Sequence, residues 1–170
     1  MLFHFSENPN IKEFIPLEGQ ANNQLSPVVW AIDEEHSVNY FLPRDCPRII
    51  YSKSTSLSEE DEKIFFSQTK ASTIMTVESD WLESIRNTTI YKYTFTDDGF
   101  SLFDRIAGYY VSYTPVQPLY VEPMHHLLEN ITSRGVELRI TPNLYPLREA
   151  ILKSTLENFS MIRMRNAKIR

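Results

Sequence analysis

The first ten residues, MLFHFSENPN, place a histidine and a serine two positions apart in an otherwise apolar stretch. Alternate side chains of a β-strand point to opposite faces, so His4 and Ser6 share one face with Leu2, while Phe3 and Phe5 share the other. Because the two phenylalanines require a core, we expect His4 and Ser6 to face away from it, toward a ligand cleft. An imidazole in a cleft can hold a ribose hydroxyl or act as a base. The alternative is the polar face of an edge strand, with the histidine bonded to a backbone carbonyl.

A second candidate lies in PVVWAIDEEH, a compact apolar run followed by acidic residues. The run predicts a central strand, and Asp33 is placed to cap a helix over residues 34–42. Trp30, near the end of the strand, is suited to stack on a flat ring of a ligand. The alternative is that Trp30 is an ordinary core residue.

The acids and histidines of the chain do not have the spacing of a metal site. Glu34, Glu35 and His36 are consecutive, and consecutive positions on a helix do not converge. His125 and His126 fail for the same reason, and neither H-x-x-x-H nor H-x-x-E-H occurs. We therefore predict no metal ligand, and a metal-dependent hydrolase is the least supported functional hypothesis.

Cys46 and the basic C-terminal stretch are weaker candidates. Arg44 and Arg48 flank Cys46 in a way that can lower the pKa of a thiol, but the sequence identifies no partner base, so a structural role is expected. The last residues form either a phosphate-binding patch or a solvated helix end. The basic residues of this stretch are Arg163, Arg165, Lys168 and Arg170.

Composition limits the class of protein. The chain has 170 residues, of which 42% are hydrophobic and 12% aromatic, so it is long and apolar enough to build a core. Its formal net charge of −5 argues against non-specific nucleic-acid binding. A single cysteine excludes an intramolecular disulfide, and no apolar stretch approaches a membrane span. We expect a cytoplasmic single domain over residues 1–170, as a monomer or small homo-oligomer.

The remaining pattern predicts short strands and helices in mixed order. Strands are expected over the first residues and over PVVWAI, RIIYSK, STIMTVE, TIYKYTF and VELRIT, with an edge or bent strand over the proline-rich segment 107–123. The segment IKEFIPL is either a short strand or an irregular apolar stretch. Helices are expected after the capping pair Ser58 and Asp61, after Ser79, before Gly135 and over residues 144–158. The last helix should bury Leu147, Ala150, Ile151 and Leu156. Residues 18–26 are polar and are predicted to form a mobile loop.

The element order and the absence of phosphate-binding loops define the expected fold class. Strands and helices do not alternate strictly, and neither GxGxxG nor GxxxxGK[ST] occurs. We therefore predict an α+β fold with mixed, mostly antiparallel sheets and flanking helices.

Several stretches together resemble known families. LFHFSENPNIKEF, VVWAIDEEH, FLPRDCPRI, AGYYVS and FSMIRMRNA resemble a family of uncharacterised bacterial proteins of similar length. His4-Phe5-Ser6, Val29-Trp30-Ala31, YKYTFTDDGF and VSYTPVQPLYVEP more distantly resemble ADP-ribosyltransferase-like domains, which often begin with H-x-[ST] on their first strand.

The second resemblance implies an ADP-ribosyltransferase-like fold and specific site residues. It implies that His4 contacts the nicotinamide-side ribose, with Ser6 beside it, and that Trp30 stacks on the nicotinamide where tyrosine is usual. Glu122 is the nearest late acid, and it would stabilise an oxocarbenium-like transition state. The implied cofactor is NAD or another nucleotide. The alternative is a non-catalytic binding or regulatory domain that uses the same cleft and the basic C-terminal stretch as a partner surface.

Overall fold

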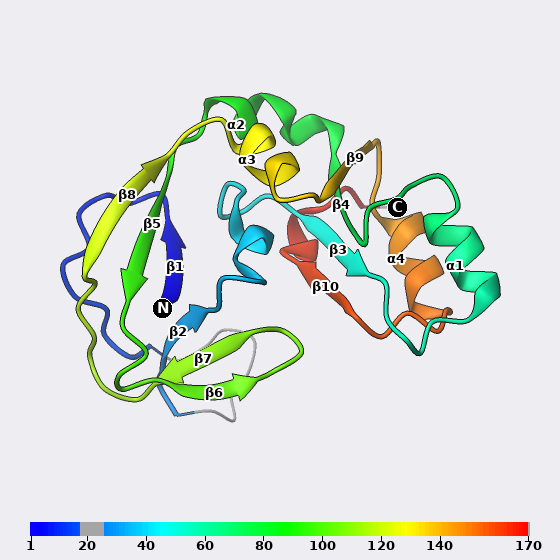
Figure 1. Cartoon of the computed structure of the whole chain (residues 1–170). Helices are drawn as coiled ribbons and strands as arrows, with labels where there is room; N and C mark the ends of the chain where they lie inside the picture. Colours follow the sequence, from blue (N-terminus) through cyan, green and yellow to red (C-terminus); the bar gives the residue numbers. More distant parts are fainter. Residues whose placement is uncertain (18–25, 170) are drawn as a thin grey trace. The chain divides into compact units, whose positions relative to one another are not determined.

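The computed structural model describes residues 1–17 and 26–169, so the loop predicted over 18–26 lies almost entirely outside the described residues. The described residues form ten strands in two sheets and four α-helices (Figure 1). The α+β class predicted from the sequence is therefore confirmed. The chain divides into a first unit, Met1–Phe41 with Thr89–His125, and a second unit, Leu42–Thr88 with His126–Arg170. A single cooperative domain over residues 1–170 stays a prediction.

The first unit is built on an antiparallel sheet in the order β6-β7-β2-β1-β5-β8. Its strands are β1 (Leu2–Ser6), β2 (Val29–Ile32), β5 (Ile90–Phe95), β6 (Ser101–Asp104), β7 (Tyr109–Ser112) and β8 (Tyr120–Met124). A 3₁₀ helix, η1 (Ser37–Tyr40), follows β2. The proline-containing strand β8 lies at an edge, as its sequence predicts, and β2 lies inside the sheet.

The two faces of this sheet follow from the strand register. Phe3 pairs with Ile32 and Phe5 pairs with Lys92, so these side chains share one face, here called the Trp30 face because Trp30 is two residues from Ile32. The opposite face carries His4 and is called the His4 face. On it lies a core cluster of Leu2, Phe14, Val29, Ala31, Tyr93 and Phe95.

The expectation that His4 faces away from the core is therefore wrong. Leu2 lies on the same face and is 3% exposed, and the ring of Phe14 lies 4.8 Å from the imidazole of His4. Both faces of β1 carry apolar side chains, because this strand is in the middle of the sheet and segments outside the sheet cover it. Alternation alone does not show which face of such a strand is open.

The second unit is built on a sheet in the order β10-β3-β4-β9. Its strands are β3 (Arg48–Ser52), β4 (Thr73–Glu78), β9 (Glu137–Thr141) and β10 (Phe159–Ile162), and β4 and β9 form its parallel pair. Its helices are α1 (Glu59–Phe66), α2 (Leu82–Asn87), α3 (Leu127–Ser133) and α4 (Tyr145–Leu152), with 3₁₀ turns η2 (Ser79–Trp81) and η3 (Met164–Asn166).

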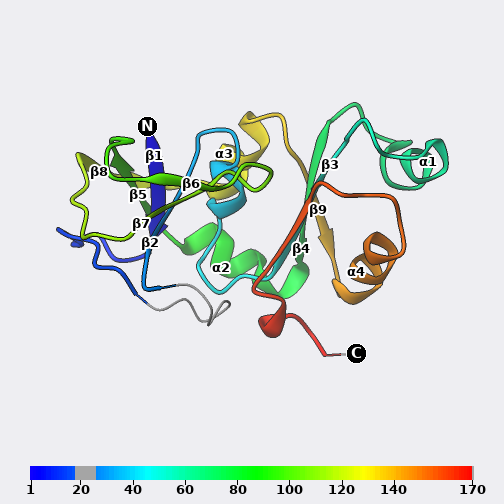
Figure 2. The same ribbon diagram turned by 90° about the horizontal axis from the view of Figure 1, so that it is seen from below.

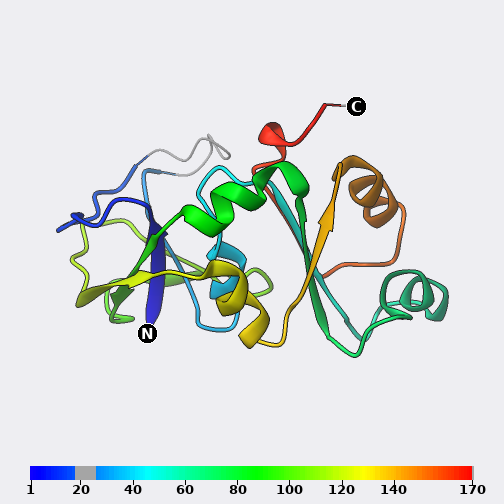
Figure 3. The ribbon, with the colours of Figure 1, turned by 90° about the horizontal axis from the view of Figure 1, so that it is seen from above.

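The helices of the second unit cover both faces of its sheet. Helices α1 and α4 lie on the same side of the strands (Figure 2), and α2 and α3 lie on the other side (Figure 3). The core under α1 and α4 contains Ile49, Tyr51, Phe65, Phe66, Ile74, Leu144, Ile151 and Leu156. No helix within the described residues is long and apolar enough to cross a membrane.

Two helix-end predictions are confirmed. The hydroxyl of Ser58 accepts a hydrogen bond from the backbone N–H of Asp61 at 3.1 Å, as a capping residue does. Gly135 adopts φ +75° and its N–H bonds to the carbonyl of Thr132, which ends α3. Local turn chemistry is therefore well predicted where the bond forms between residues close together in the chain.

Other local predictions are wrong. The helix expected over 34–42 is only the short 3₁₀ helix η1, and the helix expected over 144–158 ends at Leu152. There the hydroxyl of Ser154 bonds to the carbonyl of Ile151 at 2.7 Å and competes with continuation of the helix. Ala150 is exposed, whereas Ile151 is buried as predicted. Strands β6 and β10 were not predicted.

Candidate functional site

Aromatic side chains gather on the Trp30 face of the first unit. The indole of Trp30 lies 5.0 Å from the ring of Phe103 and 5.7 Å from the ring of Tyr109, at interplanar angles of 86° and 77°. Trp30 and Tyr109 are half-buried, and Phe103 is 42% exposed. Neither neighbour stacks parallel to the indole, as in the edge-to-face pairs of the buried core, so the cluster differs from a closed core in its exposure.

The 3₁₀ helix η1 adds a tyrosine to this group. The hydroxyl of Tyr40 lies 2.6 Å from the hydroxyl of Tyr109, and the ring of Tyr40 lies nearly parallel to Phe5 with 6.5 Å between ring centres. We call Phe5, Trp30, Tyr40, Phe103 and Tyr109 the aromatic cluster. It joins β1, β2, β6, β7 and η1 on one face of the sheet.

A histidine–aspartate pair lies where β2 ends, next to the aromatic cluster in the chain. One carboxylate oxygen of Asp33 accepts both the backbone N–H and the ring Nδ1–H of His36, each at 2.8 Å. An ionised carboxylate only accepts hydrogen bonds, so Nδ1 carries the proton and Nε2 is an acceptor in the neutral ring. Within the described residues, Nε2 of His36 has no partner. The side chains of Asp33 and His36 are 30% and 21% exposed.

Gly108 makes room for this pair. A Cβ at Gly108 would lie 2.3 Å from Nδ1 of His36 and 2.7 Å from the Asp33 carboxylate, and the residue has φ +70°. The carbonyl of Gly108 accepts the backbone N–H of Asp33 at 3.0 Å. A side chain at position 108 would therefore displace the pair and strain the backbone.

Glu122 lies on the exposed edge strand β8. Its carboxylate pairs with the ammonium of Lys92 at 3.0 Å, and the Glu122 side chain is 53% exposed. Lys92 in turn lies over the ring of Phe3, 5.5 Å from its centre. Because Phe5 pairs with Lys92 and Lys92 pairs with Glu122, all these side chains belong to the Trp30 face.

His4 contacts Trp30 only through the backbone. Its Nδ1–H donates to the carbonyl of Trp30 at 3.0 Å, and its ring packs on Phe14. The hydroxyl of Ser6 accepts the backbone N–H of Asn8 at 3.1 Å and so supports the turn after β1. The bond of His4 to a backbone carbonyl is the alternative that the sequence left open, although β1 is inside the sheet and not at its edge. A role of His4 or Ser6 in ligand binding stays a prediction.

The expected convergence of His4, Trp30 and Glu122 around one pocket is wrong. The side chains of Trp30 and Glu122 lie on the Trp30 face, and the side chain of His4 lies on the opposite face. The structure brings Trp30 together with Phe103 and Tyr109, and Glu122 together with Lys92. The sequence pattern did not distinguish the faces because the strand pairing was not known.

Cys46 lies in an environment that suppresses thiol chemistry. The residue is fully buried, and its burial raises the pKa of the thiol to about 12, although the nearby Arg48 acts in the other direction. A reactive cysteine needs an accessible thiolate. This agrees with the expectation that Cys46 is not a nucleophile.

The basic C-terminal stretch is bound to the second unit. Arg163 donates from Nε to the carbonyl of Arg44 at 3.2 Å, and Lys168 pairs with Asp80 at 2.8 Å. Arg170 lies outside the described residues. Within the described residues, no group of three or more histidine, cysteine, aspartate or glutamate side chains is placed to hold a metal ion.

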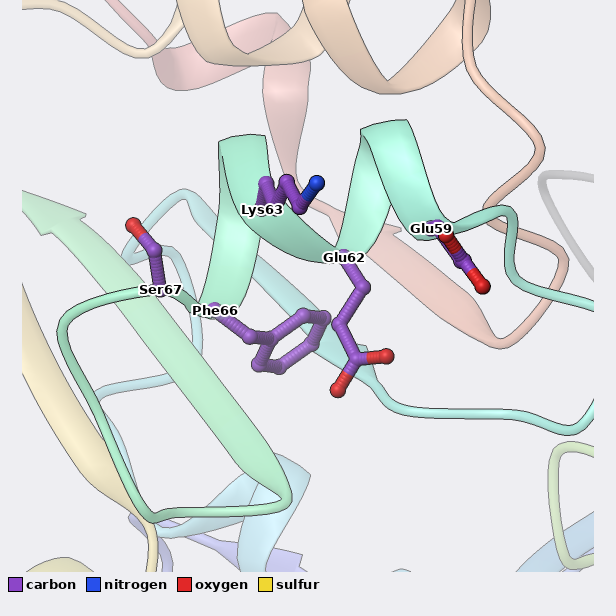
Figure 4. Close-up of a pocket in the computed structure, with 5 residues that line it drawn as sticks. All are labelled: Glu59, Glu62, Lys63, Phe66 and Ser67. Carbon is purple, nitrogen blue, oxygen red and sulfur yellow. The ribbon is translucent and has the colours of Figure 1, made fainter.

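An open depression of about 400 Å³ lies on α1 of the second unit. Figure 4 shows Glu62 and Phe66 on one side of the helix and Lys63 turned away from them. Glu62 pairs with Lys53 at 3.1 Å, and Lys53 lies 5.3 Å from the ring centre of Phe66. The depression is lined by Glu59, Glu62, Lys63, Phe66 and Ser67. It contains no convergent set of polar groups of the kind that orients a ligand.

The pair of Asp33 and His36 was not predicted as a unit. The sequence signal was present in the spacing D-x-x-H, because a carboxylate reaches the backbone N–H three residues later in a capping turn. The prediction read Asp33 only as a helix cap and His36 only as a failed metal ligand. The contact of Tyr40 with Tyr109 had no local signal, since 69 residues separate them.

The fold and the candidate site together define an α+β protein with an aromatic cluster and a histidine–aspartate pair on a six-stranded sheet. The family model of a family of unknown function, DUF6886, matches residues 3–167, and the chain belongs to this family. Searches of the curated proteins and of the solved structures found no match. The uncharacterised family expected from the sequence is therefore confirmed at this level.

Proposed function

We propose that the first unit binds a nucleotide, NAD or a related compound, over its Trp30 face. The observation that supports the proposal is the half-buried indole of Trp30 between two rings that do not stack parallel to it. A flat base or nicotinamide ring gains both apolar burial and stacking on such a surface.

Charged groups on the same face suit the other parts of a nucleotide. Lys92 offers an ammonium group for a phosphate, and its present partner Glu122 is on the edge strand, where it is more than half exposed. Exchange of an exposed carboxylate for a phosphate costs little, because an exposed ion pair is weak. His4 supports the site indirectly, since it holds the carbonyl of Trp30. Ser6 lies on the opposite face of the sheet, so its role in ligand binding stays a prediction from the sequence and is no part of this surface.

A more specific form of the proposal is that the unit catalyses ADP-ribosyl transfer. This form rests on the resemblance of the sequence to ADP-ribosyltransferase-like domains. A nucleophile would form a bond to the anomeric carbon of the nicotinamide ribose. The bond to nicotinamide would break, with its electron pair leaving on the nicotinamide nitrogen. Glu122 would stabilise the positive charge of the transition state.

Binding without catalysis is the second candidate. The observation that favours it is the exposure of Glu122, whose side chain is 53% exposed and already paired with Lys92. Catalytic acids usually lie in clefts that perturb them. A cytoplasmic location, a monomeric or small homo-oligomeric state and the lack of nucleic-acid binding belong to both forms of the proposal.

The test is ligand-dependent stabilisation and quenching of tryptophan fluorescence. The chain has two tryptophans, so Trp81→Phe leaves Trp30 as the single reporter. We expect NAD or ADP-ribose at millimolar concentration to quench Trp30 and raise the melting temperature, because a ligand of the native state stabilises it. Trp30→Leu should abolish the shift, and His4→Ala, which removes a bond to the main chain of Trp30, should reduce it.

The matched control is Trp81 itself, which lies in the second unit. Trp81→Phe should keep the full ligand-induced shift. If no nucleotide at millimolar concentration shifts the melting curve of the unmodified chain, the proposal is wrong. Release of nicotinamide from NAD distinguishes catalysis from binding alone. If the unmodified chain catalyses the transfer, Glu122→Gln should lose this release and still bind NAD.

A further inference from the structure

The outer edge of β9 is open within the second unit. β9 is the last strand in the order β10-β3-β4-β9, and among the described residues its backbone bonds only to β4. A strand at the edge of a sheet carries a row of backbone N–H and C=O groups that can pair with another strand. Ile140, in the same strand, is 49% exposed. The edge therefore offers a place for one more strand.

The other edges of the two sheets carry features that oppose strand addition. β6 has an irregular register between Leu102 and Asp104, and β8 contains Pro123, which has no N–H. β10 ends after four residues at Arg163, whose φ of +55° belongs to the left-handed region. β9 has five residues, no proline and an unbroken register with β4. Among these edges, β9 is the best suited to pair with an extended strand.

Two opposite charges lie two residues apart on β9 and share one face of the strand. Glu137 pairs with the core residue Ile74, so Glu137 and Arg139 lie on the face of the sheet that α1 and α4 cover. Leu138 and Ile140 lie on the other face. The side chains of Glu137 and Arg139 are 32% and 37% exposed, and Nε of Arg139 donates to the Glu137 carboxylate at 2.7 Å. Both charges are therefore accessible at the edge.

Neither charge is saturated by its contacts within the chain. A guanidinium has five N–H groups. In Arg139, one N–H bonds to Glu137, one bonds to the hydroxyl of Tyr51 at 3.3 Å, and the other three have no partner within the described residues. The carboxylate of Glu137 accepts from Arg139 and from the hydroxyl of Thr69, and an ionised carboxylate has about four acceptor sites. A second carboxylate and a second guanidinium can therefore be added without loss of these contacts.

The charge pattern selects one register for two antiparallel copies of β9. Directly opposite side chains share a face, so the axis of a two-fold dimer passes through a residue and not between two. An axis at Glu137 places two glutamates opposite each other, and an axis at Arg139 does the same with two arginines. An axis at Leu138 places Glu137 of each copy opposite Arg139 of the other copy. Like charges in opposite positions are destabilising and unlike charges are stabilising, so the register with Leu138 on the axis is favoured.

We propose that β9 is the interface of a two-fold homodimer, in which β9 of a second copy of this chain adds antiparallel to β9 with Leu138 on the axis. Backbone hydrogen bonds hold the two strands together, and two reciprocal pairs of Glu137 with Arg139 fix the register. The two four-stranded sheets become one continuous sheet. The interface belongs to the second unit and does not depend on the nucleotide proposed for the first unit.

The first test is the molar mass measured by sedimentation equilibrium over a range of concentrations. For the unmodified chain we expect the mass to rise from one chain to two between about 1 and about 500 µM, because a single strand pair is a small and weak interface. Glu137→Arg places two arginines in opposite positions, and Arg139→Glu places two glutamates there. Each variant alone should therefore stay monomeric over this range.

A mixture of the two variants distinguishes the interface from a structural role of the charges. In equal amounts, Glu137→Arg and Arg139→Glu oppose only unlike charges across the axis, so the mixture should form a heterodimer. The matched control is Glu62→Arg, which reverses one charge of the ion pair with Lys53 in the same unit. This variant changes the net charge by the same amount as Glu137→Arg and should dimerise like the unmodified chain.

Several results would overturn the proposal. These are an unmodified chain that stays monomeric to about 500 µM, a folded single variant that dimerises as the unmodified chain does, and a mixture of the folded variants that stays monomeric. Loss of the dimer in Glu62→Arg would likewise show that the dimer does not depend on β9 in particular. Circular dichroism establishes that each variant is folded.

Hydrogen exchange of the unmodified chain decides the question if a variant does not fold. Amide groups of β9 that point away from β4 should exchange more slowly at high than at low protein concentration, because the second copy protects them. Amide groups of the edge strand β8 serve as the internal control and should show no dependence on concentration. Exchange in β9 that is equally fast at all concentrations would mean that no second copy binds there.

Discussion

The two units differ in how deeply their polar side chains are buried and in what these side chains bond to. In the second unit, Glu78 is 1% exposed and its carboxylate accepts the backbone N–H groups of Leu144 and Lys168 at 3.0–3.2 Å. Arg48 is 2% exposed and donates to the carbonyls of Pro43 and Cys46. These buried charges bond to the main chain of their own unit, so they serve the fold.

In the first unit, the polar groups beside the aromatic cluster are only half-buried. His36 and Asp33 bond to each other, and their side chains are 21% and 30% exposed. Among the described residues, the most deeply buried charged side chains bond to the main chain, so deep burial does not by itself mark a ligand site.

The largest expected effect is on the core of the second unit. Ile151 is 1% exposed under α4, so Ile151→Ala should lower the free energy of unfolding by about 2–5 kcal/mol. The neighbour Leu152 is 52% exposed, and Leu152→Ala should change it by less than about 1 kcal/mol. Urea denaturation measures both. Equal losses for the two variants would mean that the helical phase is wrong.

The same variant tests whether the two units unfold together. Trp30 belongs to the first unit and Trp81 to the second. In single-tryptophan backgrounds, a single domain over residues 1–170 predicts the same shifted midpoint from both reporters when Ile151 is replaced. A midpoint that moves only for the Trp81 reporter would show that the units unfold independently, and the single-domain prediction would be wrong.

The next effect concerns the buried carboxylate of the second unit. Glu78→Gln keeps one acceptor oxygen but loses the charge that strengthens the bonds to Leu144 and Lys168. We expect a loss of about 1–3 kcal/mol in the free energy of unfolding. The control is Asp80→Asn, an exposed partner of Lys168, which should cost less than about 1 kcal/mol. If Glu78→Gln left the free energy of unfolding unchanged, the buried carboxylate would not stabilise the second unit, and the contrast between the two units would be lost.

The sequence predicted the class of the fold because composition and turn chemistry act locally. Ser58 caps its helix and Gly135 ends another, since each makes its bond within a few residues. It did not predict β10, whose pairing partner β3 is about 110 residues away in the chain. The basic residues around β10 were interpreted as a tail. The segment is a strand because it pairs with β3.

The candidate site was predicted in part. Trp30 lies on an inner strand, as predicted, but it is the second residue of β2 and not near its end, and His4 was placed on the wrong side of the sheet. The face of a side chain depends on which strand is its neighbour and on what covers the sheet, and Phe14 covers His4 from a segment with little strand pattern. The pairing of Tyr40 with Tyr109 likewise depends on long-range contacts.

A smaller effect is expected from acid titration at the surface of the second unit. Hydrogen bonds from the hydroxyl and backbone N–H of Thr155, at 2.6 and 2.7 Å, together with that of Ser58, lower the pKa of Asp61 from its ordinary value of 3.8. A lowered pKa in the folded state stabilises the fold above the ordinary value, and this stabilisation is lost as the pH falls through the folded-state pKa.

Asp61→Asn should therefore flatten the decline in stability below about pH 4, while it removes the stabilising contribution at neutral pH. Urea denaturation across the acidic range measures this slope. The control is Glu60→Gln, an exposed neighbour on the same helix, which should leave the slope unchanged. An unchanged slope in Asp61→Asn would show that the contacts to Thr155 do not persist in solution.

The smallest effect compares one threonine from each sheet. Thr94 in β5 and Thr76 in β4 are 1% and 3% exposed, and neither hydroxyl has a hydrogen-bond partner within the described residues. Valine has nearly the same shape and needs no partner, so Thr76→Val and Thr94→Val should be neutral or stabilising by up to about 1 kcal/mol. Thr→Ser at each site keeps the hydroxyl and loses the methyl group, and it should be destabilising by about 1 kcal/mol.

Thr94 is paired with Phe3 and so belongs to the Trp30 face. If Thr94→Val were destabilising by more than about 1 kcal/mol while Thr76→Val was neutral, the hydroxyl of Thr94 would have a partner in solution.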